Sequence, residues 1–464
     1  MYRTVTRWRR VDRRVRYHPR RRSVDESLQP LEIKPSSDDR SPIMPLSLRI
    51  KLSAMMFLQY FVWGLWLPGL GQFLDKDGIG LAADEQGWIY TVYGFGAIIG
   101  PVAVGQLADR FFSTEKVMAF CHLFGGVLLI GSAYTKSFWP LFTLLFVYCN
   151  LYMPSMGLSN SITFRAIGEE NQTRFPGIRL WGTIGWIAAG QFLSQYYKSA
   201  DTPLFDSIYS IAWIGKPAFR DCLRLAGLFS LIYGVYCFWL PHTPPVPMKS
   251  TDPIDKRSAI LESLELMRNR SFAVLVTITG LVGIMLAFYF GCENFFLGDI
   301  GTDQKEIVSF MTLGQVAEFA LMAIVPLAVE KFGVKNTMLI GAGAWALRFG
   351  LSAIGKPWWL MISTIGLHGF AFGFFFVVAQ MYVDRAASSD IKASAQNLLV
   401  FVVYGLGTIV GSILSGRLRS MFPHDWSKIW IGPFVLTILC ILAFALLFRE
   451  ETIATKKAAA EGTA

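Results

Sequence analysis

Charged residues are scarce in this chain. Asp, Glu, Lys and Arg make up 16% of its 464 residues, whereas a soluble domain usually carries about 25%. The shortage is uneven, because apolar runs such as 334–354 and 428–448 approach or reach the roughly 20 residues that a helix needs to cross a bilayer. The composition is not that of a soluble domain, and it predicts an all-α polytopic membrane protein.

Reactive groups and metal ligands are also few. The six cysteines stand singly inside apolar runs without a C-x-x-C pair, which favours buried thiols that act as small hydrophobic side chains. His, Cys and acidic residues do not gather at metal-ligand spacing, and the sequence contains no Ser-His-Asp or Walker pattern. We therefore expect no enzyme activity, no cofactor, no metal site and no ATP-driven transport.

Apolar runs between polar breaks predict twelve membrane spans. They lie near 50–74, 86–108, 115–135, 138–160, 177–197, 221–241, 271–297, 304–329, 334–354, 357–382, 391–418 and 428–449. Most Lys and Arg of the short loops lie in the even-numbered connections, so the positive-inside rule places these loops and both termini in the cytoplasm. The net charge of +10 lies mostly in the first 50 residues and in loops, so it does not indicate a nucleic-acid partner.

Short matches at nearly constant separation indicate an internal repeat. The matched segments are Asp109-Arg110-Phe111 with Glu330-Lys331-Phe332, Phe164–Ala166 with Asp384–Ala386, and GTIG at 182–185 with GTIV at 407–410. Two pseudo-symmetric six-helix halves of this kind are typical of the major facilitator fold, in which the site lies near mid-membrane between the halves. We assign conformational gating to Asp109, Arg110, Glu330 and Lys331.

The expected divisions of the chain follow from the spans and their longest connection. Residues 44–242 form the first bundle, 243–270 a cytoplasmic linker, and 271–450 the second bundle. A basic arm, 1–43, precedes them, and a cytoplasmic tail, 451–464, follows.

Glu318 is the clearest ionisable residue inside a predicted span. Such residues are costly in a membrane and are functional candidates by default. Gln315 precedes it by three residues and so lies on the same helix face. Loss of hydration favours the neutral acid and a nearby Arg favours the carboxylate, so this group can take up and release a proton. The alternatives are a permanent ion pair or a hydrogen bond to substrate without titration.

Three residues of the fifth span form a stripe on one helix face. Arg179, Thr183 and Trp186 follow one another at helical spacing among small residues, which allow another helix to approach closely. The alternative is that Arg179, near the start of the helix, extends to the cytoplasmic headgroups.

Two further stripes are candidate binding faces. His368 and Phe372 lie one turn apart in the tenth span, and Gln59 and Trp63 lie one turn apart in the first. The alternative for the histidine is a packing role among aromatic rings.

Several segments together resemble a known family. They are FLQYFVWGLW, FPGIRLWGTIGW, MTLGQVAEFALMAIVP, KFGVKNTML, LHGFAF and IKASAQ, and they extend from about Met44 to Arg449. The chain resembles the bacterial nucleoside:proton symporters of the major facilitator superfamily. This resemblance implies that Arg179, Thr183, Gln315 and Glu318 line a nucleoside site, with Arg179 facing Glu318 across a cavity. Trp186, His368 and Phe372 match aromatic positions of the family.

The chain also departs from the family pattern. Gly373 stands where some members carry Asp, and apolar residues at 286–291 replace span-seven amides that read the nucleobase. Family members begin just ahead of the first span, which matches Met44. Residues 1–43 are then either a disordered arm that binds anionic lipid or the product of a translation start assigned too early.

These inferences predict a secondary transporter of the bacterial inner membrane. It imports nucleosides, or a nucleoside-like polar solute, with protons by alternating access, and works as a monomer. The alternative within transporters is a proton-coupled sugar or polyol symporter on the same fold. From another class, the alternative is a membrane sensor that has lost transport.

Overall fold

The computed structural model describes residues 44–168, 171, 174–202, 215–245, 264–387 and 392–450, apart from the side chains of Ala103, Gln106, Asp109, Arg110 and Ala393. Helices dominate these ranges, which contain no strand. The all-α prediction is confirmed. The predicted arm 1–43, the tail 451–464 and the side chains of Asp109 and Arg110 lie outside the description.

The first group of helices covers the predicted spans one to six. Its members are α1 (Leu46–Trp66), α2 (Leu70–Leu74), α3 (Ala83–Arg110), α4 (Thr114–Ser132), α5 (Phe138–Ile167), α6 (Phe175–Lys198) and α8 (Asp221–Tyr236), with short 3₁₀ segments η2 (Ser199–Asp201) and η4 (Cys237–Trp239). Helix α1 packs on α6 and α8, α3 packs on α5, and α4 packs on α5 and α8.

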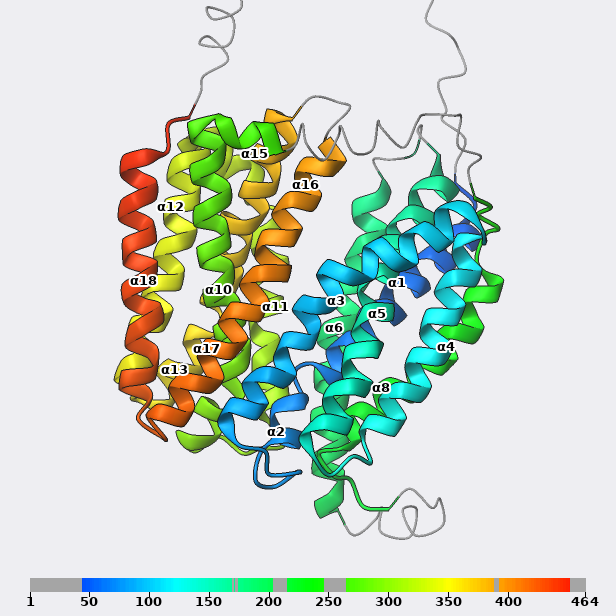
Figure 1. The fold of residues 1–464 in the computed structure, drawn as a ribbon, viewed down its shortest axis with the longest axis horizontal. Helices are drawn as coiled ribbons and strands as arrows, with labels where there is room; N and C mark the ends of the chain where they lie inside the picture. The colour runs from blue at the N-terminus through cyan, green and yellow to red at the C-terminus, as the bar shows by residue number, and fades with distance from the viewer. Residues whose placement is uncertain are drawn as a thin grey trace, which may run out of the picture. The chain divides into compact units, whose positions relative to one another are not determined.

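The second group covers spans seven to twelve. Its members are η5 (Leu266–Arg268), α10 (Arg270–Asp299), α11 (Ile307–Met322), α12 (Val325–Ile354), α13 (Trp358–Thr364), α14 (Leu367–Ala371), η6 (Phe372–Val377), α15 (Val378–Ala386), α16 (Lys392–Val400), η7 (Phe401–Gly407), α17 (Thr408–Met421) and α18 (Trp426–Leu447). Helix α18 runs along α12, as Figure 1 also shows. Spans ten and eleven each contain a π-helical segment, η6 and η7, of the kind often found at functional sites.

Gly333 divides α12 into two parts. Its φ of 76° and ψ of 169° interrupt the helix, and glycine adopts this region without a Cβ penalty. The first part of α12 therefore completes the eighth span after α11, and the second part is the ninth. The described helices thus correspond to the twelve predicted spans.

The helices differ in how clearly their composition identifies them as spans. Nine described helices or helical stretches are long and apolar enough to cross a membrane, and α11 is a shorter apolar helix. Helices α3 and α6 are long but are not among the nine. Helix α6 carries Arg179, Thr183 and Gln191, and polar residues of this kind lower its mean hydropathy.

Polar contacts between the two groups of helices gather at one end of them. Asn294 donates from Nδ2 to the Pro68 carbonyl at 2.9 Å, and Arg417 Nη1 lies 3.3 Å from Asp84 Oδ2. Further contacts there are the ion pairs Lys198–Glu306 and Lys305–Asp201. Gln191 also donates to Thr312 of α11, and Ser194 donates to the carbonyl of Lys305, just before α11. In the described ranges, every hydrogen bond or ion pair between the groups lies at this end, opposite the connections predicted to be cytoplasmic.

Candidate functional site

Arg179 lies on α6 and reaches the neighbouring helix α1. Helix α6 begins at Phe175 with Pro176 in its first turn, a position that suits proline. The guanidinium carbon of Arg179 lies 4.0 Å from the centroid of the Tyr60 ring, at the distance of a cation–π contact. A Cβ at Gly182 would lie 2.7 Å from both Arg179 Nη1 and Tyr60 Cδ2, so a glycine here leaves room for this pair.

Gln315 and Glu318 lie on α11, which packs against α6 from the other group of helices. Both side chains are half-buried, as are Arg179 and Thr183 on α6. Glu318 is close enough to Arg179 to interact with it electrostatically. Among the described side chains, however, the two form no ion pair within 4.0 Å. The buried Oε1 of Gln315 has no hydrogen-bond partner, so this oxygen can still accept a hydrogen bond from a polar solute.

Aromatic rings of the first helices lie beside Arg179. The Trp63 ring stacks on Tyr93 with centroids 5.6 Å apart and an interplanar angle of 10°. The Trp63 ring also meets Trp186 of α6 edge-on, with a centroid distance of 4.7 Å, and lies 5.8 Å from the Tyr60 ring. From the other group of helices, Tyr404 of η7 lies in the neighbourhood of Glu318, Tyr60 and Arg179. These rings could stack a nucleobase.

His368 of α14 lies against the segment of α11 that carries Gln315 and Glu318. A Cβ at Gly314 would lie 3.1 Å from the Cβ of His368, and one at Gly369 would lie 2.5 Å from the backbone N of Glu318. The His368 ring stacks on Phe372, with centroids 5.9 Å apart. The structure therefore brings His368 and Phe372 to the same segment as two other predicted site residues.

Gln59 lies in a different environment from the other predicted residues. Its side chain is buried inside the first group of helices, where Nε2 donates to Ser155 Oγ at 2.9 Å. Its Oε1 lies 3.1 Å from Nε2 of His122, whose Nδ1 lies 3.1 Å from Ser230 Oγ. The neighbouring Tyr60, rather than Gln59, contacts Arg179.

The residues assigned to gating form no described contact between the two groups of helices. Glu330 and Lys331 precede Gly333 and are exposed, and Lys331 Nζ lies 5.5 Å from the ring of Phe332. The description does not include the side chains of their counterparts, Asp109 and Arg110.

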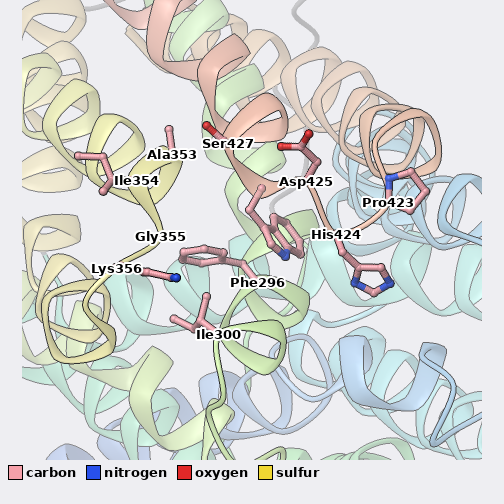
Figure 2. A pocket seen from close by; sticks show the side chains of 11 residues that line it. Phe296, Ile300, Ala353, Ile354, Gly355, Lys356, Pro423, His424, Asp425 and Ser427 are labelled. Carbon is pink, nitrogen blue, oxygen red and sulfur yellow. The ribbon is translucent and has the colours of Figure 1, made fainter.

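Figure 2 shows a recess in the second group of helices. Its volume is about 470 Å³, and it is lined by Phe296, Ile300, Ala353, Ile354, Gly355, Lys356, Pro423, His424, Asp425, Trp426 and Ser427. It lies where the ends of α10 and α12 meet the connection before α18, and none of the predicted site residues lines it. Within the described ranges, no group of three or more His, Cys, Asp or Glu could hold a metal ion.

Sequence reasoning missed several residues next to the predicted ones. Tyr60, Tyr93 and Tyr404 gave no signal, because an aromatic residue in an apolar span looks the same whether it packs in a core or borders a site. Arg348 in α12 did give a signal, since a charged residue inside the predicted span 334–354 is a functional candidate by the rule applied to Glu318.

Comparison with known proteins identifies the family. The model of the family described as "Nucleoside H+ symporter" matches residues 46–453. The putative nucleoside transporter YegT of Escherichia coli (strain K12) is 35% identical over 421 residues, which cover 86% of this chain and 94% of the relative. The xanthosine permease of the same organism is 29% identical over 428 residues, covering 88% of this chain and 97% of the relative.

A solved structure supports the same conclusion. The crystal structure of the D323A mutant of the nucleoside transporter NupG matches with a TM-score of 0.76 and 27% identity, covering 87% of this chain and 100% of that structure. The family match extends over nearly all the described residues, and the relatives are matched almost end to end. This chain belongs to the nucleoside H⁺ symporter family, a group of transporters within the major facilitator fold.

Proposed function

We propose that this protein imports nucleosides, or closely similar polar solutes, together with protons across the bacterial inner membrane. The observation that carries the proposal is the approach of Arg179 and Glu318 from opposite groups of helices without a direct ion pair. Because the guanidinium and the carboxyl group are not bonded to each other, both can form hydrogen bonds with a polar solute. Two relatives, the putative nucleoside transporter YegT and a xanthosine permease, support nucleosides as the substrate class.

Recognition of the sugar would use the polar residues of α6 and α11. Ribose hydroxyls both donate and accept hydrogen bonds, so they suit the guanidinium of Arg179, the carboxyl group of Glu318 and the unpartnered Oε1 of Gln315. Thr183, one turn after Arg179, adds a hydroxyl from the same helix face. Of the alternatives, a sugar or polyol symporter is not favoured by the family match.

Recognition of the base would rely on stacking. Trp63, Tyr93 and Trp186 form a connected group of rings beside Arg179, while Phe372 packs with His368 on the other side of the interface. Every nucleobase has a π-face, so stacking tolerates different bases. This agrees with the apolar residues at 286–291, which contribute no amide to read base edges.

Proton coupling would depend on Glu318. With the carboxyl group protonated it donates a hydrogen bond, and with the proton lost it interacts with Arg179 instead. Proton and substrate together would favour one arrangement of the two bundles over the other, which is a shift of a pre-existing equilibrium. No covalent chemistry is required.

Alternating access would open and close the two ends of the bundles 44–242 and 271–450, joined by the linker 243–270. The contacts at the outer end, among them Asn294–Pro68 and Lys198–Glu306, support an arrangement that opens toward the cytoplasm. Gating at the cytoplasmic end would involve Asp109, Arg110, Glu330 and Lys331. The protein would act as a monomer in the lipid bilayer with both termini in the cytoplasm.

Uptake into proteoliposomes tests this function. We expect labelled nucleosides to accumulate when an inward proton gradient is imposed, and a panel of purine and pyrimidine nucleosides to compete with one another. Ribose and glucose should not compete. Accumulation of a sugar with no competition by any nucleoside would contradict the proposed substrate class.

A further inference from the structure

A buried ion pair in the second group of helices has no part in the function proposed above. Nη2 of Arg348 on α12 donates to Oε1 of Glu293 on α10 at 3.0 Å, and the two side chains are 1% and 2% exposed. The pair makes a single hydrogen bond. Oε2 of Glu293 and Nη1 of Arg348 are buried without a hydrogen-bond partner.

Stability alone does not explain such a pair. Desolvation of two buried charges offsets much of their attraction, and well-packed hydrophobic replacements are often neutral or stabilising. A buried polar group that is only partly hydrogen-bonded raises the cost further. A role in positioning other residues is therefore a better explanation than a gain in stability.

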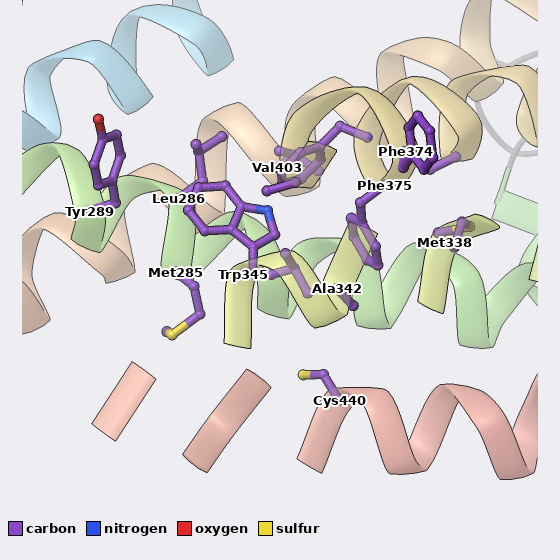
Figure 3. Close-up of a cluster of buried hydrophobic side chains, with 14 of the residues drawn as sticks. Met285, Leu286, Tyr289, Met338, Ala342, Trp345, Phe374, Phe375, Val403 and Cys440 are labelled. Atoms are coloured by element: carbon purple, nitrogen blue, oxygen red, sulfur yellow. The ribbon is translucent and has the colours of Figure 1, made fainter. Parts of the chain in front are cut away.

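The pair contacts the aromatic residues that surround His368. The guanidinium carbon of Arg348 lies 4.0 Å from the centroid of the Tyr289 ring, and Tyr289 precedes Glu293 by one turn of α10. The rings of Tyr289 and Trp345 both lie 5.5 Å from that of His368, and Trp345 meets it edge-on. Figure 3 shows Tyr289 and Trp345 within the hydrophobic core of this group of helices.

His368 connects these rings to the candidate site. It is buried, and its neighbour Gly369 packs directly on the backbone of α11 at Ala317 and Glu318. Gly314, one residue before Gln315, lies against the Cβ of His368. A shift of His368 would therefore move the backbone that carries Gln315 and Glu318.

We propose that Glu293 and Arg348 are positioning residues of the substrate site. They fix Tyr289 and Trp345 around His368, and His368 in turn holds α14 against the segment of α11 that presents Gln315 and Glu318 to the solute. The inference rests on the proposed function. It adds two residues, remote from the solute, that determine how tightly the solute is bound.

A neutral double variant separates positioning from stability. Glu293→Gln combined with Arg348→Gln removes both charges, so no unpaired charge is left buried. We expect the purified variant to unfold at the wild-type temperature but to bind labelled uridine with a Kd raised about tenfold, the range of coupling between residues in contact. Thr437→Val is the matched control, because Thr437 is equally buried in α18 and bonds only to its own helix at the Pro433 carbonyl. Its Kd should not change.

A second measurement asks whether the effect passes through His368. In a His368→Phe protein, the double substitution should change the Kd no further, because the positioned residue is already lost. A wild-type Kd in the double variant would overturn the inference. So would a further rise of the Kd by about tenfold when the double substitution is added to the His368→Phe protein. If the double variant does not fold, Arg348→Lys keeps the charge but loses the planar fork. We expect a raised Kd in this variant too, and an unchanged one would overturn the inference.

The two proposals fail differently. A wild-type protein that binds no nucleoside would contradict the proposed function. A wild-type protein that binds uridine while these variants bind it equally well would contradict only the role of Glu293 and Arg348.

Discussion

Replacement of Glu318 by Gln is the perturbation that separates substrate binding from proton coupling. Gln has nearly the same shape and can still hydrogen-bond a solute, but it cannot carry a proton in and release it. Glu318 forms no ion pair within 4.0 Å with Arg179 in the described structure, so the substitution breaks no direct bond between them. We therefore expect the protein to fold and to bind substrate.

The expected sizes of the two effects differ. In the substrate-bound state Glu318 is protonated and neutral, so Gln alters at most one neutral hydrogen bond, worth about 1 kcal/mol, and the Kd of substrate should rise by no more than about fivefold. Accumulation should vanish instead of weakening. With one proton per substrate, each unit of pH difference supplies about 1.4 kcal/mol and drives about tenfold accumulation in the wild type. The Glu318→Gln protein should stop at equal concentrations inside and outside.

Proteoliposomes allow both effects to be measured on one preparation. Counterflow of labelled nucleoside against unlabelled nucleoside reports binding and exchange, and uptake under an inward proton gradient reports coupling. Glu265→Gln is the control, because this acid is 61% exposed and lies outside the spans, before α10. Accumulation at the wild-type level by Glu318→Gln would refute the reasoning, as would an equal loss in Glu265→Gln.

Three further predictions follow from particular contacts. Arg179→Lys keeps the charge but loses the planar fork over Tyr60, so the Kd should rise about tenfold in a binding assay; wild-type affinity would favour an arginine that merely extends to the headgroups. Gly369→Ala places a Cβ 2.5 Å from the backbone N of Glu318 and should lower uptake strongly. Gly177→Ala is the control and should leave uptake unchanged, because its Cβ would meet no atom within 4 Å. Equal uptake by both variants would contradict the close packing of α14 on α11. Asn294→Ala removes the 2.9 Å bond to Pro68, worth about 1 kcal/mol, and should raise labelling of an introduced outer-end cysteine about fivefold; unchanged labelling would show that this bond does not stabilise the closed end.

Much of the fold and part of the candidate site could be predicted from the sequence. Twelve spans and two halves follow from apolar runs, loop charges and repeated turns, because the bilayer restricts a spanning chain to helices of a set length. Arg179, Gln315 and Glu318 stand out as candidates because polar side chains are costly inside a span and therefore conspicuous.

The remainder depends on which way each helix face points. The spacing of Gln59 and Trp63 predicts that they share a face, but it does not say whether that face meets the other bundle or its own core. The structure places Gln59 in a hydrogen-bonded network with His122 and Ser155. The contact of Tyr60 with Arg179 needs the packing of α1 on α6, where Gly182 leaves the space. No local pattern encodes such a contact.

Proton movement driven by nucleoside tests the central claim most directly. Wild-type proteoliposomes with a pH-sensitive dye inside and no initial pH difference would receive external nucleoside. The proposed symport predicts that the interior becomes acidic as nucleoside enters, and that the Glu318→Gln protein gives no such change. Entry of nucleoside through the wild-type protein with no change of internal pH would contradict proton coupling.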